Sequence, residues 1–326
     1  MVMRKRGVLN DEQARSLAAF RDVRIVHDGF QDALARISNF HLAGRYSDSP
    51  GVMSLIGYTG AGKTSIIKEY CRTHNKKGEF KKVLSIVVPE NCTVKNLASR
   101  ILSAIGDPRP THGTREDMEN RIKYYSDRTQ VELIVFDEFQ HISVRGSSSR
   151  QYDAADWIKT QVEVLKKPIL FSGLPEVENI FVVNPQLETR RKGKIQLSPF
   201  SLKSEEGREA IHLFFHSINQ RLPLPKPDRS ALLEAKSIRL LVSSSNGVLG
   251  YMMRVVHLAA ELAILERRQT LRYEHLTQAL EELPESQVSI KKGMMRPVAV
   301  LSAASYRRST KAKGDGSDSG RYNGSL

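Results

Sequence analysis

One eight-residue segment constrains the fold of this chain more than any other. Residues 57–64 read Gly-Tyr-Thr-Gly-Ala-Gly-Lys-Thr and match G-x-x-x-x-G-K-[ST], the glycine-rich loop that cradles phosphates. The apolar residues 52–56 before it predict a buried strand, and residues 65–70 after it predict the first turns of a helix. Strand, loop and helix in this order are the context that the motif needs, so the sequence predicts a phosphate-binding α/β domain.

The residue types of this loop predict that it binds ATP with Mg²⁺. Glycines let backbone N–H groups turn toward a phosphate chain, and the helix N-terminus adds the positive end of its dipole. Lys63 is expected to neutralise the β- and γ-phosphates, and Thr64 is expected to bind Mg²⁺. The predicted nucleotide contacts in the loop are Gly57, Thr59, Gly60, Ala61, Gly62, Lys63, Thr64 and Ser65.

A second motif lies about 70 residues further on. Residues 131–138 form an apolar run that ends in Asp137 and Glu138, and a continuous apolar run is typical of a parallel strand buried on both faces. Because open α/β sheets bind ligands at the carboxyl ends of their strands, both acids are expected at the nucleotide site. Asp137 is predicted to hold Mg²⁺, and Glu138 to act as the base that orients the attacking water.

The composition favours a cytoplasmic protein with a polyanionic partner. The net charge is +14, which suggests nucleic acid. No apolar run approaches the roughly 18 residues of a membrane helix, and the basic N-terminus lacks the apolar stretch of a signal peptide. Cys71 and Cys92 do not form a zinc or disulfide pattern. We therefore expect no membrane association.

Strand and helix patterns alternate up to about residue 200, and only helix patterns follow. The predicted strands are 52–56, 83–88, 131–136, 168–172 and 194–197, which together suggest about five parallel strands. Helices are expected at 204–222, 229–243, 248–268 and 273–283. The predicted domains are an N-terminal helical segment (1–50), an α/β nucleotide-binding domain (51–200), a small all-helical lid (201–284) and a disordered basic tail (285–326).

Three segments resemble the AAA+ ATPases of the TniB/TnsC type, which regulate Tn7-like and Mu-like transposons. Residues 136–141 (Phe-Asp-Glu-Phe-Gln-His), 168–175 (Pro-Ile-Leu-Phe-Ser-Gly-Leu-Pro) and 184–190 (Asn-Pro-Gln-Leu-Glu-Thr-Arg) carry the resemblance, which covers roughly residues 20–283. It implies an ATPase that assembles on double-stranded DNA as a ring or filament of identical subunits. It also implies two partners, a DDE transposase and a TniQ-like target selector, with hydrolysis controlling disassembly.

The resemblance also assigns nucleotide-site roles to three residues. Ser172 lies near the sensor-one position, although a small residue at a strand end would look the same. Arg190 matches the arginine finger that reaches the γ-phosphate of a neighbouring subunit, and Arg191 beside it is an alternative. The family usually has a basic sensor-two residue at the start of the lid helix, where this chain has Tyr-Met-Met at 251–253 and the closest cation is Arg254.

The predicted DNA contacts rest on the same resemblance. Lys95 and Thr114 match channel-facing positions, and Arg109 and Arg115 are neighbours that would help. A lysine and a hydroxyl at loop–helix junctions suit phosphate contacts, which carry little sequence information, but ordinary exposed polar residues occur at helix starts too. The basic tail, with eight Lys or Arg and two Asp in residues 287–326, would touch DNA, touch a partner, or do neither.

Two other functions remain open. A replication-type AAA+ helicase loader or initiator would share the motifs, although initiators usually append a winged helix after the lid and only about 40 residues of low complexity follow here. An ATP-gated protein scaffold that never touches DNA is the third reading. The positive charge and the residues Glu138 and Arg190 favour a DNA-binding ATPase.

Overall fold

The computed structural model describes residues 7–23, 27–90, 92–143, 148–284 and 286. Its sheet contains β1 (Val52–Gly57), β2 (Val83–Val87), β3 (Leu133–Asp137), β4 (Ile169–Gly173) and β5 (Arg191–Leu197). Their order is β2-β3-β4-β1-β5, and β3 runs parallel to both β2 and β4. All residues of β1, β3 and β4 are buried, as expected for central strands covered on both faces. The predicted α/β fold is therefore confirmed.

The chain forms two compact units. One takes in the described parts of Met1–Asn39, Leu55–Thr73 and Ile195–Arg296, and the other takes in those of Phe40–Ser54 and His74–Lys194. Helix α2 (Asp28–Arg45) and strand β1 contribute residues to both units. The domain boundaries predicted at residues 50, 200 and 284 stay predictions. The predicted tail lies outside the described residues except for Ser286.

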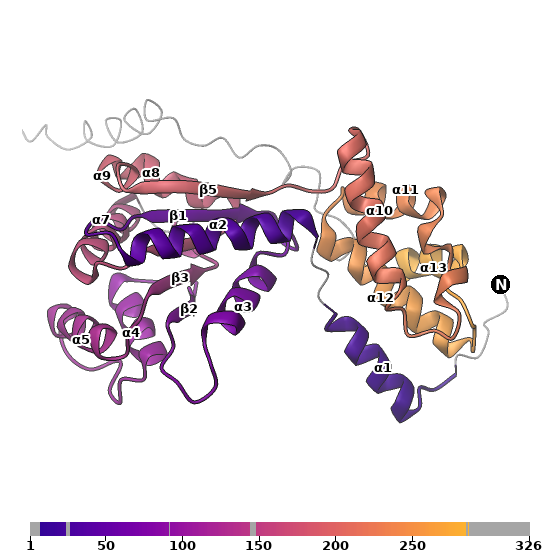
Figure 1. Ribbon diagram of the computed structural model, residues 1–326, viewed down its shortest axis with the longest axis horizontal. Helices are drawn as coiled ribbons and strands as arrows, with labels where there is room; N and C mark the ends of the chain where they lie inside the picture. The colour runs from indigo at the N-terminus through magenta and orange to yellow at the C-terminus, as the bar shows by residue number, and fades with distance from the viewer. Residues whose placement is uncertain (1–6, 24–26, 91, 144–147, 285, 287–326) are drawn as a thin grey trace, which may run out of the picture. The chain divides into compact units, whose positions relative to one another are not determined.

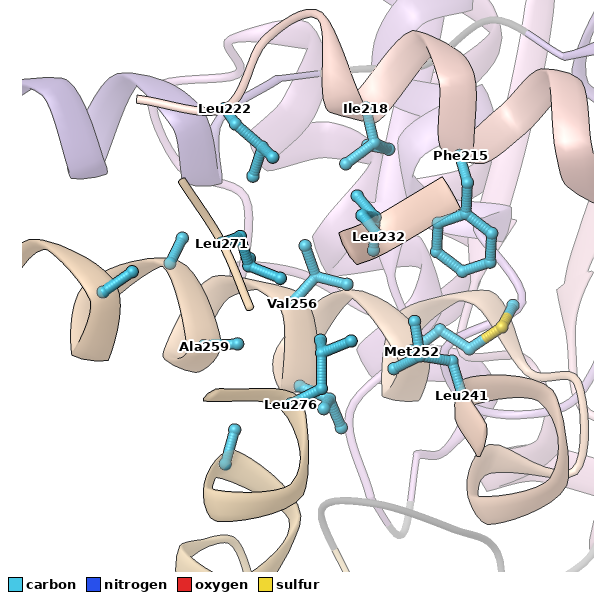
Figure 2. Packing of buried hydrophobic residues seen from close by; sticks show 14 of the residues in the cluster. Phe215, Ile218, Leu222, Leu232, Leu241, Met252, Val256, Ala259, Leu271 and Leu276 are labelled. Carbon is cyan, nitrogen blue, oxygen red and sulfur yellow. The ribbon is translucent and has the colours of Figure 1, made fainter. Parts of the chain in front are cut away.

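The first unit holds the phosphate loop, α3 (Lys63–His74) and a group of C-terminal helices (Figure 1). These are α10 (Glu205–Asn219), α11 (Ala235–Ser245), α12 (Leu249–Leu265) and α13 (Tyr273–Glu282), and we call them the lid. Their shared core includes Phe215, Met252, Val256 and Leu276, whose side chains converge in Figure 2. Helix α1 (Asp11–Arg21) packs against α12, so the predicted all-helical lid is present.

In the second unit, helices cover the strands. They are α4 (Val94–Ile105), α5 (Arg115–Arg128), α6 (Gln140–Ser143), α7 (Ser148–Leu165), α8 (Asn179–Val183) and α9 (Pro185–Glu188), with a 3₁₀ turn η1 (Pro175–Glu178). Thr93 caps α4 and Thr114 caps α5, as side-chain oxygens at this position satisfy first-turn N–H groups. Phe139 and Phe171 stack with ring centroids 4.4 Å apart and tie α6 to the sheet.

Two helix predictions differ from the structure. The expected helix at 229–243 is replaced by two 3₁₀ turns, η2 (Pro227–Arg229) and η3 (Ala231–Leu233), followed by α11. Ser230 and Glu234 have extended backbones, which interrupts a helix that side-chain spacing alone would continue. The short elements η1, α8 and α9 were not predicted, and Pro175 and Pro185 stand at first helical positions of η1 and α9. None of the described helices is long and apolar enough to cross a membrane.

Candidate nucleotide site

The phosphate loop connects β1 to α3 (Figure 1). Gly60 and Gly62 have φ values of +83° and +96°, a left-handed conformation that side chains with a Cβ rarely adopt. The Lys63 ammonium is buried and donates to the carbonyl oxygens of Gly57 at 2.7 Å and Tyr58 at 3.1 Å. The loop therefore already has the curved backbone and inward-held cation of a phosphate cradle. Thr64 and Ser65, in the first turn of α3, are exposed.

A cavity of about 480 Å³ adjoins this loop within the same unit. Tyr58 and Ala61 of the loop contribute to its lining together with His27, Phe200, Leu213, Phe214 and Val248. The His27 ring lies 5.6 Å from the Phe200 ring and 6.1 Å from the Phe214 ring, and burial lowers the pKa of His27. An aromatic cavity with a neutral imidazole beside a phosphate loop fits a planar base of a nucleotide.

The lid reaches the phosphate loop through the start of α12. The Gly250 N–H donates to the Gly60 carbonyl at 2.9 Å, and Val248 and Tyr251 pack together with Tyr58. Arg254 is exposed, and its guanidinium lies 5.0 Å from the centre of the Tyr251 ring. Its predicted role as a sensor-two cation stays a prediction.

In the second unit, Asp137 and Ser172 meet at the ends of β3 and β4. Both are buried, and the Ser172 hydroxyl donates to Asp137 Oδ1 at 2.7 Å. The Glu138 backbone N–H donates to the same oxygen at 3.0 Å. Asp137 is thus oriented by two donors, which is how a carboxylate is held ready to bind a metal ion.

Glu138 follows in a strained backbone conformation, with φ of +57°. Gln140 donates its side-chain amide to the Glu138 carboxylate and accepts the Leu174 N–H at 3.2 Å. Strain of this kind in a non-glycine residue costs about 1–3 kcal/mol and concentrates at functional sites. The role of Gln140 could not be predicted, because nothing local to residues 136–141 shows that its side chain bridges to the end of β4.

The two finger candidates lie in different surroundings of the same unit. Arg190 donates to the Gln186 carbonyl at 2.9 Å and pairs with Glu163, whose side chain is 49% exposed. Arg191 pairs with Glu178, which is 8% exposed, and its guanidinium lies 4.5 Å from the centre of the Phe181 ring. Both arginines are half-buried, but Arg191 pairs with a buried carboxylate and Arg190 pairs with an exposed one.

The candidate DNA contacts also fall in the second unit. Lys95 and Arg109 are exposed. The Thr114 hydroxyl is engaged in the cap of α5, where it donates to Asp117 at 2.8 Å, and Arg115 pairs with Glu119 at 2.7 Å. The loop that carries Arg109 and Thr114 is held by a residue that sequence reasoning missed, Arg121.

Arg121 ties this loop together from α5. It pairs with the buried Asp107 at 3.0 Å and donates to the carbonyl oxygens of Arg109, at 3.0 Å, and His112. Asp107 in turn accepts the Arg109 N–H at 2.7 Å. A planar guanidinium with several donors suits such bridging, so residues 107–114 form an ordered loop.

The sequence profile described as bacterial TniB protein matches residues 16–201, which is more than half of the 326 residues. The chain belongs to the bacterial TniB protein family. This assignment confirms the resemblance that residues 136–141, 168–175 and 184–190 carry. Among curated proteins, none matches the chain.

Solved structures with a similar fold include an ORC1 protein, a Cdc6p protein and a Walker-type ATPase. The Aeropyrum pernix ORC1 protein, solved in complex with DNA, is 18% identical with a TM-score of 0.59, over 82% of this chain and 68% of that one. Cdc6p from Pyrobaculum aerophilum is 12% identical with a TM-score of 0.58, over 85% and 72%. A Walker-type ATPase of Pyrococcus abyssi is 13% identical with a TM-score of 0.52, over 80% and 75%. At these identities the likeness shows the fold, and it confirms the predicted AAA+ architecture.

Proposed function

We propose that this protein is an ATP-dependent, DNA-binding regulator of transposition. In this proposal it oligomerises on duplex DNA as a ring or filament and connects a target selector to a DDE transposase, and hydrolysis controls its disassembly. The observation that carries the proposal is the formed phosphate cradle at residues 57–64 in a chain that belongs to the TniB family.

The nucleotide part rests on the first unit. Gly57, Thr59, Gly60, Ala61 and Gly62 supply the curved backbone, and the cavity beside Tyr58 receives the base. Lys63 exchanges its carbonyl partners for the β- and γ-phosphates, a short movement for a buried ammonium already held over the loop. Thr64 and Asp137 would hold Mg²⁺, and the bound ion supplies positive charge to the phosphates.

The hydrolytic part rests on the second unit. Glu138 orients the attacking water, while Gln140 holds the Glu138 carboxylate and Ser172 holds Asp137. Arg190 acts on the nucleotide of a neighbouring subunit, which supports assembly-dependent turnover because charge that develops on the γ-phosphate needs a cation. Its exposed partner Glu163 favours it over Arg191, whose partner Glu178 is buried.

The DNA part rests on charge and on the ordered loop. The net charge of +14 and the exposed Lys95 and Arg109 suit phosphate contacts, which predict sequence-tolerant, salt-sensitive binding. Thr114 and Arg115 are exposed as well, with their side chains engaged in the cap and ion pair of α5. The similar Aeropyrum pernix ORC1 protein was solved with DNA, which supports this part.

A replication-type loader or initiator is the second candidate, and the fold likeness to ORC1 and Cdc6p favours it. A transposase gene with a DDE catalytic domain beside the gene for this chain would favour the transposition role. Membership in the TniB family favours the transposition role over the replication role. The likeness to ORC1 and Cdc6p is weaker support, because those proteins are only 18% and 12% identical to this chain.

The proposal is tested by measuring how the variant Lys63→Ala binds ATP and DNA. Loss of the ammonium should abolish ATP binding and, with it, ATP-dependent DNA binding measured by fluorescence anisotropy. Lys68→Ala is the matched control, because Lys68 is an exposed lysine on the same helix. Wild-type protein that binds DNA equally with and without ATP would contradict ATP gating, and wild-type protein that binds no ATP would contradict the proposal as a whole.

A further inference from the structure

The first turn of α12 hydrogen-bonds to the phosphate loop through backbone atoms. Helix α12 begins at Leu249 after the cap residue Val248, and first-turn N–H groups have no acceptor inside their own helix. Gly250 N–H finds its acceptor in the carbonyl of Gly60, at 2.9 Å. Two residues further along, Met252 begins the buried face of α12 in the lid core (Figure 2). The N-terminal end of α12 therefore contacts the lid core through Met252 and the phosphate loop through Gly250.

Close approach of the two backbones requires glycine at position 250. A Cβ at Gly250 would lie 2.9 Å from both Cα and O of Gly60, closer than non-bonded carbon atoms approach. The obstructing atoms are backbone, so no side-chain rotation relieves the clash. Gly60 needs glycine for a different reason, its φ of +83°.

The contact fixes one peptide unit of the loop at both ends. The peptide bond between Gly60 and Ala61 is planar, so its carbonyl and N–H move together. Gly250 holds the carbonyl, and the Tyr58 carbonyl accepts the Ala61 N–H at 3.0 Å. The orientation of the following N–H groups, those of Gly62 and Lys63, depends on this peptide plane.

We propose that Gly250 is a positioning residue for nucleotide binding, which keeps the phosphate loop in its phosphate-receiving conformation and couples α12 to the bound nucleotide. The inference rests on the proposed function, since it assumes that residues 57–64 bind ATP. It assigns the coupling to the backbone at the start of α12, whereas the sequence pointed to a side chain, Arg254.

The test compares Gly250→Ala with Gly44→Ala. Gly44 lies in α2 in the second unit, where a Cβ would meet Pro168 at 2.7 Å, so the two variants introduce a similar crowding. Binding of a fluorescent ATP analogue should weaken about tenfold in Gly250→Ala, or 1.4 kcal/mol, and stay at the wild-type affinity in Gly44→Ala. An affinity of Gly250→Ala within twofold of wild type would overturn the inference, and so would an equal loss in both variants.

Hydrogen exchange in the wild type keeps the inference testable if Gly250→Ala does not fold. The Gly250 amide should exchange slowly without nucleotide, because it is hydrogen-bonded, and more slowly still with ATP and Mg²⁺. Fast exchange without nucleotide, or no change on saturation with ATP, overturns the coupling even if ATP binds. Absence of ATP binding by the wild type contradicts the proposed function instead, which separates the two failures.

Discussion

Replacing Arg191 by alanine should destabilise the second unit far more than the same replacement of its neighbour Arg190. The Arg191 and Glu178 side chains are 19% and 8% exposed, and breaking a buried ion pair costs about 3–5 kcal/mol because one charge stays buried without a partner. Lys194, 3.7 Å away, and Ser54, which donates at 2.7 Å, still satisfy Glu178. The loss should therefore lie near the lower limit, at about 3 kcal/mol.

Arg190 and Glu163 are 25% and 49% exposed, and surface pairs of this kind contribute about 0–1 kcal/mol. Arg190→Ala is therefore the matched control for Arg191→Ala. It should keep the stability of the wild type and, if Arg190 is the finger, lose ATP turnover while retaining ATP binding.

Urea denaturation followed by tryptophan fluorescence measures the difference. The sequence has a single tryptophan, Trp157, which is fully buried in the second unit. With a urea dependence of about 1–3 kcal/mol per molar, a loss of about 3 kcal/mol should lower the midpoint of Arg191→Ala by on the order of 1–3 M. Equal losses of stability in the two variants, or a loss of less than about 1 kcal/mol in Arg191→Ala, would show that the Arg191–Glu178 pair does not stabilise the second unit.

Three further predictions concern other parts of the molecule. Glu138→Gln should bind ATP with wild-type affinity and lower turnover by at least about 100-fold, a typical contribution of a general base; rapid turnover would refute the role of Glu138. Arg121→Ala should loosen residues 107–114, which it bridges, and weaken DNA binding measured by anisotropy without changing ATP affinity; unchanged DNA affinity would remove this loop from the interface. Burial lowers the pKa of His41 from 6.5 to about 4, although Glu132 opposes this and His74 and Arg45 reinforce it. His41 of the unfolded chain therefore binds a proton more tightly than His41 of the folded chain, and the free energy of unfolding should fall by up to about 3 kcal/mol as the pH drops from 6.5 to 4. Urea titrations at several pH values should show a smaller fall for His41→Gln than for the wild type.

Features with a local cause could be predicted from the sequence. The phosphate loop, the buried strands and the loop–helix junction at Thr114 follow from short-range spacing, and the structure confirms the fold that they imply. The predicted strand ends also agree within about three residues, since apolar runs end where a strand leaves the core. Helices with regular apolar faces, such as α10 and α12, were predicted for the same reason.

Contacts between distant segments could not be predicted. The cavity beside Tyr58 combines residues from positions 27, 200 and 248, and no local pattern marks them as neighbours. Gln140 reaches Leu174 across two strand ends, and Gly250 reads as an ordinary glycine until its backbone is seen against Gly60. Such positions depend on long-range packing, which determines which side chains a fold brings together.

Electron microscopy of the purified protein with duplex DNA shows whether ATP controls its assembly on DNA. Samples with a slowly hydrolysed ATP analogue and Mg²⁺ are compared with samples without nucleotide, and Lys63→Ala serves as the control that lacks the phosphate-binding ammonium. We expect rings or filaments on DNA only for the wild-type protein with the analogue. Assemblies that form equally without nucleotide, or no assembly on DNA in either sample, would contradict it.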